Sequence, residues 1–216
     1  SDIGCYGGEI QTPNLNRLAQ EGIRFSHFYN AGRSCPSRAS LLTGLYPHEA
    51  GIGRMTFDDH LPGYRGTMTH NGVTIAEVLK DAGYQTGMVG KWHIAETPLR
   101  SDQRLWLAHQ VYHEEFTSKD NYPTHRGFQD YYGTIYGVVD YFDPFSLVNG
   151  EVPVREVPKD YYSTIALTDT AVSYINRYSK SDKPFFMYLA YHSPHWPLHA
   201  LPEDIKKYEN VYKVGW

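Results

Sequence analysis

The stretch FFMYLA, residues Phe185–Ala190, is the most apolar run in the sequence, and it decides the fold class. A strand that is apolar on both faces is expected in the middle of a parallel sheet, where helices cover both faces. The preceding residues, from about 161 to 178, carry Ile165, Val172 and Ile175 at helical spacing. A helix followed by a buried strand is the repeating unit of an α/β fold.

A second helix-and-strand unit lies in the middle of the chain. Thr74 and Glu77 are spaced as a capping box, in which each side chain reaches the other residue's backbone N–H. Gly83 is placed to end this helix, and a short strand is expected over Tyr84–Val89. The apolar stripe of the helix consists of Ile75, Val78 and Leu79.

A third unit lies near the start of the sequence. Thr12 can cap a helix that begins at Pro13, and Gly22 is placed to end it. The residues that follow alternate in polarity, which predicts a strand over residues 23–30 with both faces at least partly covered. The three units together predict an α/β fold with a mostly parallel sheet flanked by helices.

Two long stretches, residues 51–71 and 99–158, lack these signals and are rich in Tyr, Gly, Pro and His. Loops of that length in a compact domain are usually functional or poorly ordered. Within the second stretch, the aromatic residues of Tyr131–Val148 can either line a pocket for sugars or pack in a core.

Composition excludes several classes of protein. The 216 residues carry 20 Lys and Arg against 24 Asp and Glu, a net charge of −4, which argues against a surface that wraps nucleic acid. The longest apolar run, Pro184–Tyr191, is too short to span a bilayer. Cys5 and Cys35 cannot make a disulfide framework. No signal-peptide pattern stands at the N-terminus, so a signal is absent or removed.

Polar side chains follow each predicted strand. These clusters are residues 30–38, 91–93 and 192–199. In open α/β sheets, ligands bind beyond the carboxyl ends of the strands. The three clusters are therefore expected to converge on one edge of the sheet and form a site.

The first cluster contains Ser34-Cys35-Pro36-Ser37-Arg38, followed by a short helix signal that ends at Gly44. Ser34 then lies at a helix N-terminus, where free N–H groups and the helix dipole favour negative charge. Arg38, one turn later, can point back with a planar fork that suits an oxyanion. The alternative is that Ser34 or Ser37 is an ordinary N-cap and Arg38 a surface residue.

The other two clusters offer cations and imidazoles. Lys91 and His93 point the same way if the extended conformation persists, and a cation beside a proton-transfer group suits an anionic substrate. His195 lies in a turn that two prolines stiffen. The alternative for each is a solvated lysine or a structural histidine. The remaining histidines show no metal-binding spacing of the HExxH kind.

The three clusters together resemble the sulfatase family of the alkaline phosphatase superfamily. The family signature is Cys or Ser, any residue, Pro, Ser or Thr, and Arg, then a short helix that ends in Thr-Gly. Here it stands as residues 34–38 with Leu41-Leu42-Thr43-Gly44. The flanking matches, in order along nearly the whole chain, are residues 1–8, Thr12–Leu15, Gly90–His93 and His195–Pro197.

The resemblance implies roles for individual residues. Ser34 matches the residue that is oxidised to formylglycine, whose hydrated form attacks sulfur, gives a covalent sulfate ester and then expels sulfate. Arg38 matches the arginine that holds the formylglycine oxygens, and Lys91 the lysine that bridges formylglycine and sulfate. His93 matches the base for the second hydroxyl, and His195 a sulfate-binding histidine near the leaving oxygen. The expected partners are a small sulfated substrate, of the sugar class, and a maturation enzyme that generates formylglycine.

The sequence departs from the family pattern in two respects. Most members have Cys at position 34, and the neighbouring Cys35 occupies a variable position and is not the nucleophile. Members also bind calcium through an Asp-Asp pair upstream and an Asp-Asn pair downstream. Neither pair is present here, so Ser34 is the only expected calcium ligand in this chain, and Asp2 is not one.

The chain is about half as long as family enzymes. We therefore expect residues 1–216 to be part of a single sulfatase catalytic domain that lacks its first strand and its C-terminal part, with an incomplete alkaline-phosphatase-like fold. This segment alone, or a form with an unconverted Ser34, is expected to be inactive. A periplasmic or secreted location is expected from the family.

Three functions remain open at this level. The first is hydrolysis of a sulfate ester on a carbohydrate, alcohol or phenol. The second is a phosphatase or phosphodiesterase of the same superfamily that uses Ser34 directly as the nucleophile. The third is a sulfatase-like binding protein that keeps the anion pocket without turnover.

Overall fold

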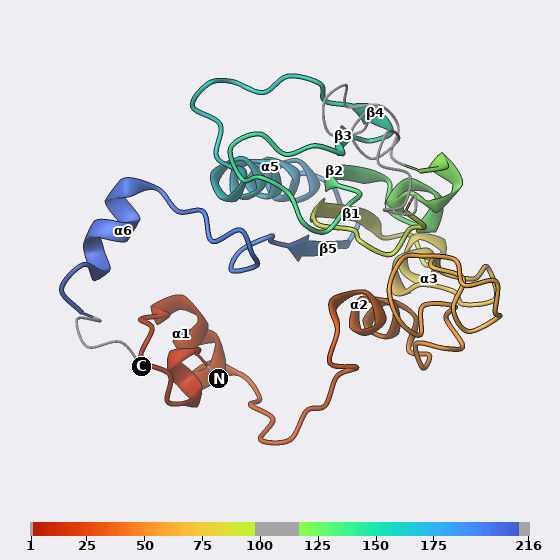
Figure 1. The fold of residues 1–216 in the computed structure, drawn as a ribbon, viewed down its shortest axis with the longest axis horizontal. Coiled ribbons are helices and arrows are strands. Elements are labelled where there is room, and N and C mark those ends of the chain that lie inside the picture. Colours follow the sequence, from red (N-terminus) through yellow and green to blue (C-terminus); the bar gives the residue numbers. More distant parts are fainter. Residues whose placement is uncertain (1, 98–116, 212–216) are drawn as a thin grey trace. The chain divides into compact units, whose positions relative to one another are not determined.

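A computed structural model describes residues 2–97 and 117–211. The chain divides into two compact units, residues 1–30 and 31–216, and each is described by itself. Figure 1 follows the chain through both. The helices and strands in order are η1 Gly4–Tyr6, α1 Pro13–Glu21, α2 Ser34–Thr43, α3 Ile75–Asp81, β1 Gln85–Gly90, η2 Lys119–Asn121, η3 Pro123–Arg126, β2 Asp130–Thr134, β3 Leu147–Asn149, β4 Val152–Pro153, α5 Ser163–Tyr178, β5 Phe185–Ala190 and α6 Pro202–Tyr208.

The second unit is built on one five-stranded sheet with the order β4-β3-β2-β1-β5. Strand β1 pairs in parallel with both β2 and β5, so that Val89 is opposite Tyr132 on one side and Leu189 on the other. The hairpin of β3 and β4 extends the sheet antiparallel to β2. The predicted α/β class, with a mostly parallel sheet flanked by helices, is confirmed.

The two faces of the sheet are covered by different helices. Met88 of β1 packs with Tyr131 of β2 in the core cluster that includes buried residues of α2 and α3. Val89, the next residue of β1, packs instead with Leu167 and Ala171 of α5. Successive residues of a strand point to opposite faces, so this alternation sets α2 and α3 on one face and α5 on the other. Figure 1 shows α5 lying along the sheet.

The position predicted for Phe185–Ala190 is wrong, although its strand is correct. Within the described residues β5 is an edge strand, and Phe185 and Leu189 are each 39% exposed. The middle strand of the parallel part, β2-β1-β5, is β1, whose residues after Gln85 are all buried. An apolar run indicates that a strand's side chains are covered, but the order of strands depends on pairing between distant segments.

Helices α3 and α5 form where predicted but bury other faces. The capping box of α3 is present, with Glu77 N donating to Thr74 Oγ1 at 3.1 Å. Ala76, not Ile75 or Val78, is its buried residue. In α5 the predicted stripe of Ile165, Val172 and Ile175 is 40–50% exposed, and the buried residues are Ser163, Leu167, Ala171 and Tyr178. The apolar stripe read from the sequence is therefore not the buried face of either helix, and small residues such as Ala76 and Ala171 take part in the contact with the sheet.

The first unit contains η1 and α1, and α1 has the predicted bounds. Thr12 is the N-cap residue, but its hydroxyl accepts from Gly4 N at 3.0 Å and donates to Asn16 Oδ1 instead of capping the helix. The strand predicted over residues 23–30 is wrong: the segment has no strand, and Ile23 and Tyr29 are more than 80% exposed. Alternation alone does not make a strand, because a strand needs a neighbour that accepts its backbone hydrogen bonds.

Of the two stretches predicted as irregular, the first is irregular and the second contains strands. Residues 51–71 contain only an isolated bridge between Ile52 and Tyr64. The stretch 99–158 holds η2, η3 and the three strands β2, β3 and β4, which sequence patterns missed. Its first part, 99–116, lies outside the described residues. Most aromatic residues of 131–148 pack in the core, and Tyr131, Tyr136 and Tyr141 are at most 5% exposed.

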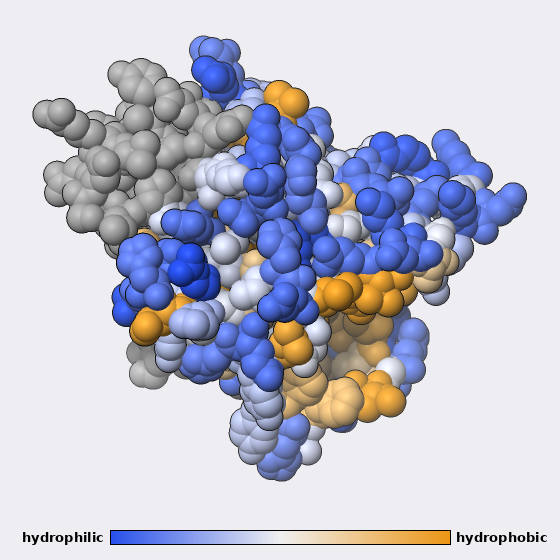
Figure 2. Space-filling model, turned by 90° about the vertical axis from the view of Figure 1, so that its right-hand side faces the viewer, coloured by the Kyte–Doolittle hydropathy of each residue, from blue (hydrophilic) through white to orange (hydrophobic). Residues whose placement is uncertain are grey.

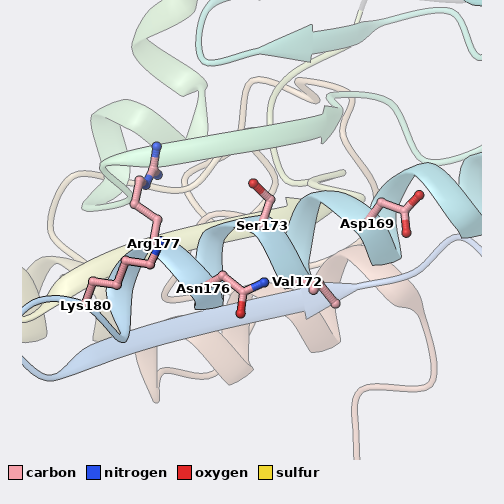
Figure 3. Close-up of a pocket in the computed structure, with 6 residues that line it drawn as sticks. All are labelled: Asp169, Val172, Ser173, Asn176, Arg177 and Lys180. Atoms are coloured by element: carbon pink, nitrogen blue, oxygen red, sulfur yellow. The ribbon is translucent and has the colours of Figure 1, made fainter.

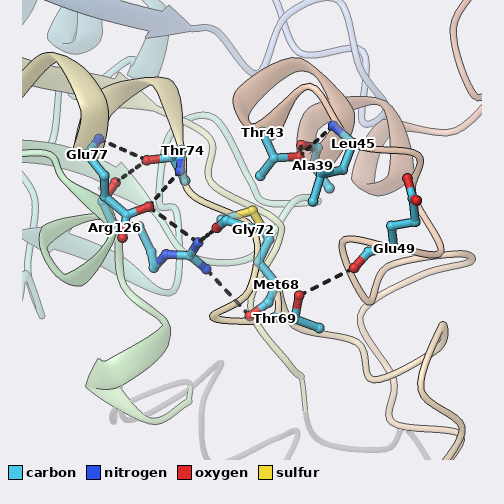
Figure 4. A network of polar contacts seen from close by, with 10 residues as sticks. All are labelled: Ala39, Thr43, Leu45, Glu49, Met68, Thr69, Gly72, Thr74, Glu77 and Arg126. Atoms are coloured by element: carbon cyan, nitrogen blue, oxygen red, sulfur yellow. Dashed lines mark hydrogen bonds and ion pairs between the residues drawn. The ribbon is translucent and has the colours of Figure 1, made fainter.

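A buried arginine ties the irregular loop 67–73 to α3 (Figure 4). Arg126 is 3% exposed, and its Nη2 donates to the carbonyl of Gly72 at 2.5 Å and lies 3.5 Å from Glu77 Oε2. The Thr74 hydroxyl donates to the Arg126 carbonyl at 2.9 Å. The capping box is thus joined through one guanidinium to a loop that has few regular hydrogen bonds of its own.

Replacing Arg126 with methionine is expected to lower the free energy of unfolding by about 2–4 kcal/mol, because buried carbonyl acceptors and a carboxylate lose their partner. Arg54→Met is the matched control, since Arg54 makes an exposed ion pair with Asp59 at 3.5 Å and should cost less than about 1 kcal/mol. Urea unfolding of the whole protein measures both. Equal, small effects of the two variants contradict the role given to Arg126.

No helix among the described residues is long and apolar enough to cross a membrane. The face shown in Figure 2 is largely hydrophilic, with separate apolar patches.

Candidate active site

The polar cluster of residues 34–38 forms the start of α2. The helix begins at Ser34, with Arg33 as an N-cap residue whose side chain makes no capping bond. Gly44 ends the helix with φ +72°, and its N–H donates to the Ser40 carbonyl at 2.8 Å. Ser34 therefore lies in the first turn, where unpaired N–H groups and the dipole favour an anion.

Arg38 joins α2 to the sheet. Its Nε donates to Ser34 Oγ at 3.1 Å, and its Nη1 donates to the Lys91 carbonyl at 2.7 Å and to Tyr188 Oη at 3.2 Å. The alternative of a solvated surface arginine does not hold, because three separate elements hold the guanidinium. One of them, Tyr188 of β5, was not identified from the sequence.

Lys91 is the first residue after β1 and is 2% exposed. Its N–H donates to the Ala190 carbonyl at 2.8 Å, which continues the pairing of β1 with β5. Burial, and then the charge of Arg38, lower the pKa of Lys91 from 10.5 to about 8. Within residues 2–97 and 117–211, no carboxylate forms an ion pair with Lys91 or Arg38.

His93 follows two residues later but not in an extended strand. Its φ is +55°, so the condition under which Lys91 and His93 would share a face is not met. Its backbone N–H donates to the Ile135 carbonyl at 3.0 Å, and its side chain is buried. Burial, and then the charges of Lys91, Arg38 and His195, lower the pKa of His93 well below 6.5.

The His93 ring is closely enclosed, yet both of its nitrogens lack a hydrogen-bond partner in the described structure. Tyr136 packs edge-on at 5.3 Å between ring centroids. A Cβ atom at Gly137 would lie 1.8 Å from His93 Nδ1, so the ring occupies space that only glycine leaves. Buried polar atoms are normally paired, so these nitrogens indicate a place for a ligand or water.

The loop after β5 supplies two more histidines. His195 is exposed, its Nδ1 lies 2.6 Å from the Trp196 carbonyl, and Tyr141 Oη donates to the His195 carbonyl at 2.8 Å. His192 is 4% exposed, and its Nε2 lies 2.7 Å from Thr134 Oγ1. His195 was singled out from the sequence, whereas His192 was not.

The structure thus brings Ser34, Arg38 and Lys91 into one cluster through hydrogen bonds. His93 and His195 lie close enough for their charges, with those of Lys91 and Arg38, to act on one another. An arginine, a buried lysine without a carboxylate partner and unpaired imidazole nitrogens form a site that favours an oxyanion.

Cys35 is fully buried beside Ser34, and its Sγ lies 3.8 Å from Met55 Sδ. Burial is the largest influence on its pKa, which is raised from 9.0 to about 11. A buried, protonated thiol is inert as a nucleophile. The expectation that Cys35 does not react therefore agrees with its surroundings.

The described residues do not provide enough ligands for the expected calcium ion. They contain no group of three or more His, Cys, Asp or Glu side chains that could hold a metal ion. Ser34 alone offers one oxygen, and calcium takes six to eight oxygen ligands.

The surface of α5 has a hollow that shares no lining residue with the site around Ser34. Its lining comes from that helix and the residue Lys180 beyond it, and Figure 3 shows Asp169, Ser173 and Arg177 projecting from the helix. None of the cationic or imidazole groups around Ser34 lines it.

A family model described as Sulfatase matches residues 1–216. An arylsulfatase of Klebsiella aerogenes is 36% identical over 219 residues, covering 100% of this chain and 45% of that protein.

Two solved structures are similar in fold and sequence. One, a crystal structure of Ps i-CgsB in complex with k-i-k-neocarrahexaose, has a TM-score of 0.76 and 31% identity over 97% of this chain and 46% of its own. The other holds its substrate D-glucosamine-2-N,6-O-disulfate and has a TM-score of 0.68 and 29% identity over 98% of this chain and 35% of its own. The likeness confirms the alkaline-phosphatase-like fold, and the chain spans less than half the length of these proteins.

Proposed function

The chain belongs to the sulfatase family, and from this membership and the cationic site we propose that the protein hydrolyses a sulfate ester on a carbohydrate. The observation that carries the proposal is the pair of cations, Arg38 and Lys91, beside Ser34 with no carboxylate partner among the described residues. A sulfuryl group in transfer spreads negative charge over its oxygens, and fixed cations in a buried site stabilise that charge.

We further propose that Ser34 acts as formylglycine, made by a maturation enzyme that oxidises the serine side chain by passing its two electrons and two protons to an electron acceptor of that enzyme. When present, the hydrated aldehyde supplies the hydroxyl that attacks sulfur and a second hydroxyl that allows sulfate to leave. Arg38 Nε, 3.1 Å from Oγ of residue 34, orients that oxygen. The calcium ion expected at residue 34 remains a prediction that needs ligands from outside this chain.

His93 and His195 are proposed to have different roles. His93 is buried with a strongly lowered pKa, so it is neutral at pH 7 and one ring nitrogen can accept a proton. His195 donates its Nδ1 proton to the Trp196 carbonyl, so it binds a sulfate oxygen next to the leaving alcohol in the form in which Nε2 also carries a proton. The Lys91 side chain is buried and its charge acts on His93 and Cys35, so its ammonium group is proposed to stabilise the bound sulfate.

A sulfated sugar is the proposed substrate class. Its support is that one structural relative holds D-glucosamine-2-N,6-O-disulfate as substrate and another holds a neocarrahexaose. The test is release of sulfate from sulfated mono- and oligosaccharides by the full-length protein, with the matching phosphate esters in parallel. Sulfate release is expected. Phosphate release without sulfate release, or binding of the sulfated sugar without turnover, contradicts the proposal.

The high-pH limb of kcat/KM is expected near pH 8. Lys91 has a lowered pKa of about 8, so it carries its charge below that pH and loses it above. The Cys35 thiol stays neutral in this range because burial raises its pKa to about 11. The rate constant should therefore fall about tenfold per pH unit above the limb.

Lys91→Arg tests this assignment, because a guanidinium keeps its charge to above pH 12. The high-pH limb should then disappear or move upward by more than one pH unit, whatever the absolute activity. A limb that stays near pH 8 in this variant shows that another group titrates.

Gly137→Ala is expected to lower kcat/KM by about 10²-fold. The added Cβ would lie 1.8 Å from His93 Nδ1, so the ring must move, and a displacement of about 1 Å in a catalytic group costs that much. Gly53→Ala is the matched control, since its Cβ would also meet a histidine ring, 2.5 Å from His48 Cδ2. That variant should keep kcat/KM within a few-fold, and similar losses in both would contradict a specific role for Gly137.

A further inference from the structure

His192 takes part in a short chain of hydrogen bonds that fixes its protons. Thr134 Oγ1 donates to the Tyr136 carbonyl at 2.8 Å. The same oxygen lies 2.7 Å from His192 Nε2. All three residues are buried, and Thr134 is the last residue of β2, directly next to the exit of β1.

This geometry selects one tautomer of the imidazole. A carbonyl oxygen only accepts, so the single hydroxyl proton of Thr134 must lie toward Tyr136. Thr134 Oγ1 can then only accept from His192, and the proton of the ring lies on Nε2. In the neutral imidazole the other nitrogen, Nδ1, has no proton and carries a free lone pair.

His192 Nδ1 is buried and has no hydrogen-bond partner in the described structure. Burial, and then the charges of Lys91, Arg38 and His195, lower the pKa of His192 to about 3. Trp92 N donates to the Thr134 carbonyl at 2.9 Å, and His195 N donates to the His192 carbonyl at 2.9 Å, so the ring lies beside the segments that carry Lys91, His93 and His195. A buried acceptor of this kind is unfavourable until a donor occupies it.

We propose that His192 is a neutral acceptor in the anion site, held by Thr134 in the Nε2–H form so that Nδ1 receives a hydrogen bond from a hydroxyl group. The hydroxyl belongs to the sulfated substrate or to a water bound with it. The second half of this proposal rests on the proposed function, since a sulfated sugar carries hydroxyl groups next to the sulfate.

The chemistry of the site makes such an acceptor selective. Arg38 and Lys91 only donate, and they therefore bind oxyanion oxygens and leave a hydroxyl proton without a partner. The Nδ1 lone pair repels a sulfate oxygen and accepts a hydroxyl. His192 thereby distinguishes the alcohol side of a sulfate ester from its anionic side. A site that bonds a substrate hydroxyl also rejects analogues that lack it.

The tautomer is tested by NMR on the full-length protein with ¹⁵N-labelled histidine, with His192→Gln to assign the signal. We expect a neutral Nε2–H imidazole that stays unprotonated to below pH 5. A proton on Nδ1, or titration near pH 6.5, overturns the proposal. This measurement does not depend on any activity, so it separates failure of this inference from failure of the proposed function.

Variants at Thr134 test how the tautomer is fixed. Thr134→Val removes the acceptor and should mix the two tautomers and lower kcat/KM roughly tenfold, whereas Thr134→Ser should restore the Nε2–H form. Thr86→Val is the matched control: Thr86 is equally buried in β1 and donates to the Gly127 carbonyl at 2.6 Å. If Thr86→Val changes the His192 signal as Thr134→Val does, the effect is general and the proposal fails.

Two ligands distinguish the source of the hydroxyl. Glucosamine 6-sulfate offers hydroxyl groups, and inorganic sulfate offers none. A change of the Nδ1 signal to that of a hydrogen-bonded acceptor with the sugar alone identifies the sugar hydroxyl. The same change with inorganic sulfate, or before any ligand is added, identifies water. A signal typical of an unbonded nitrogen under all three conditions overturns the proposal.

Discussion

Replacing Ser34 with alanine is expected to reduce sulfate release by roughly 10⁴–10⁶-fold, to background, because the variant has no oxygen at the position of the nucleophile. Arg38 Nε then loses the partner that lies 3.1 Å away, but its bonds to the Lys91 carbonyl and Tyr188 remain. The fold should therefore survive. The rate of sulfate release from a sulfated sugar measures the effect.

Ser40→Ala is the control for this variant, since it removes a hydroxyl from the same helix six residues further on. It should release sulfate at a rate within a few-fold of the natural sequence. Substantial sulfate release by Ser34→Ala, with an intact fold, would mean that another group attacks the ester.

Replacing Arg38 with lysine is expected to lower kcat/KM by about 10²–10³-fold, the usual cost of one lost donor to a developing oxyanion. The planar fork of arginine reaches Ser34, Lys91 and Tyr188 at the same time. An ammonium group keeps the charge but not this geometry. The loss should appear in kcat more than in KM, because charge grows in the transition state.

Arg33→Lys makes the same change on an exposed neighbour that precedes α2, and it should have little effect. A loss of less than about tenfold in Arg38→Lys would show that charge alone suffices and that the fixed guanidinium geometry has no special role.

Local signals predicted the individual elements of this fold well. The capping box of Thr74 and Glu77, the αL glycine at 44 and the strand over residues 185–190 depend on neighbours in the sequence, and each is present. The hairpin of β3 and β4 was missed because its strands have three and two residues, too short for a periodic pattern.

Features that depend on distant segments were not predictable in the same way. Among the described residues, β5 is at the edge because it pairs only with β1, and the segment 23–30 has no strand beside it. Both errors have one cause. The pattern of apolar residues indicates which side chains are buried, but it does not indicate which other strand pairs with the segment.

In the candidate site, too, residues in local motifs were predicted and residues that act from distant segments were not. Residues 34, 38, 91, 93 and 195 stand in motifs, so the sequence alone marked them. Gly137, Tyr188 and Thr134 stand in no motif, and each acts through space on a residue more than 40 positions away. A glycine that leaves room for an imidazole, or a threonine that holds one, carries no local signature.

The mass of the peptide that contains residue 34, taken from a preparation that releases sulfate, tests the central claim most directly. We expect the peptide to be lighter by two hydrogen atoms than the sequence with serine requires, in a fraction that rises and falls with activity. A fully active preparation in which residue 34 is entirely serine would contradict the account.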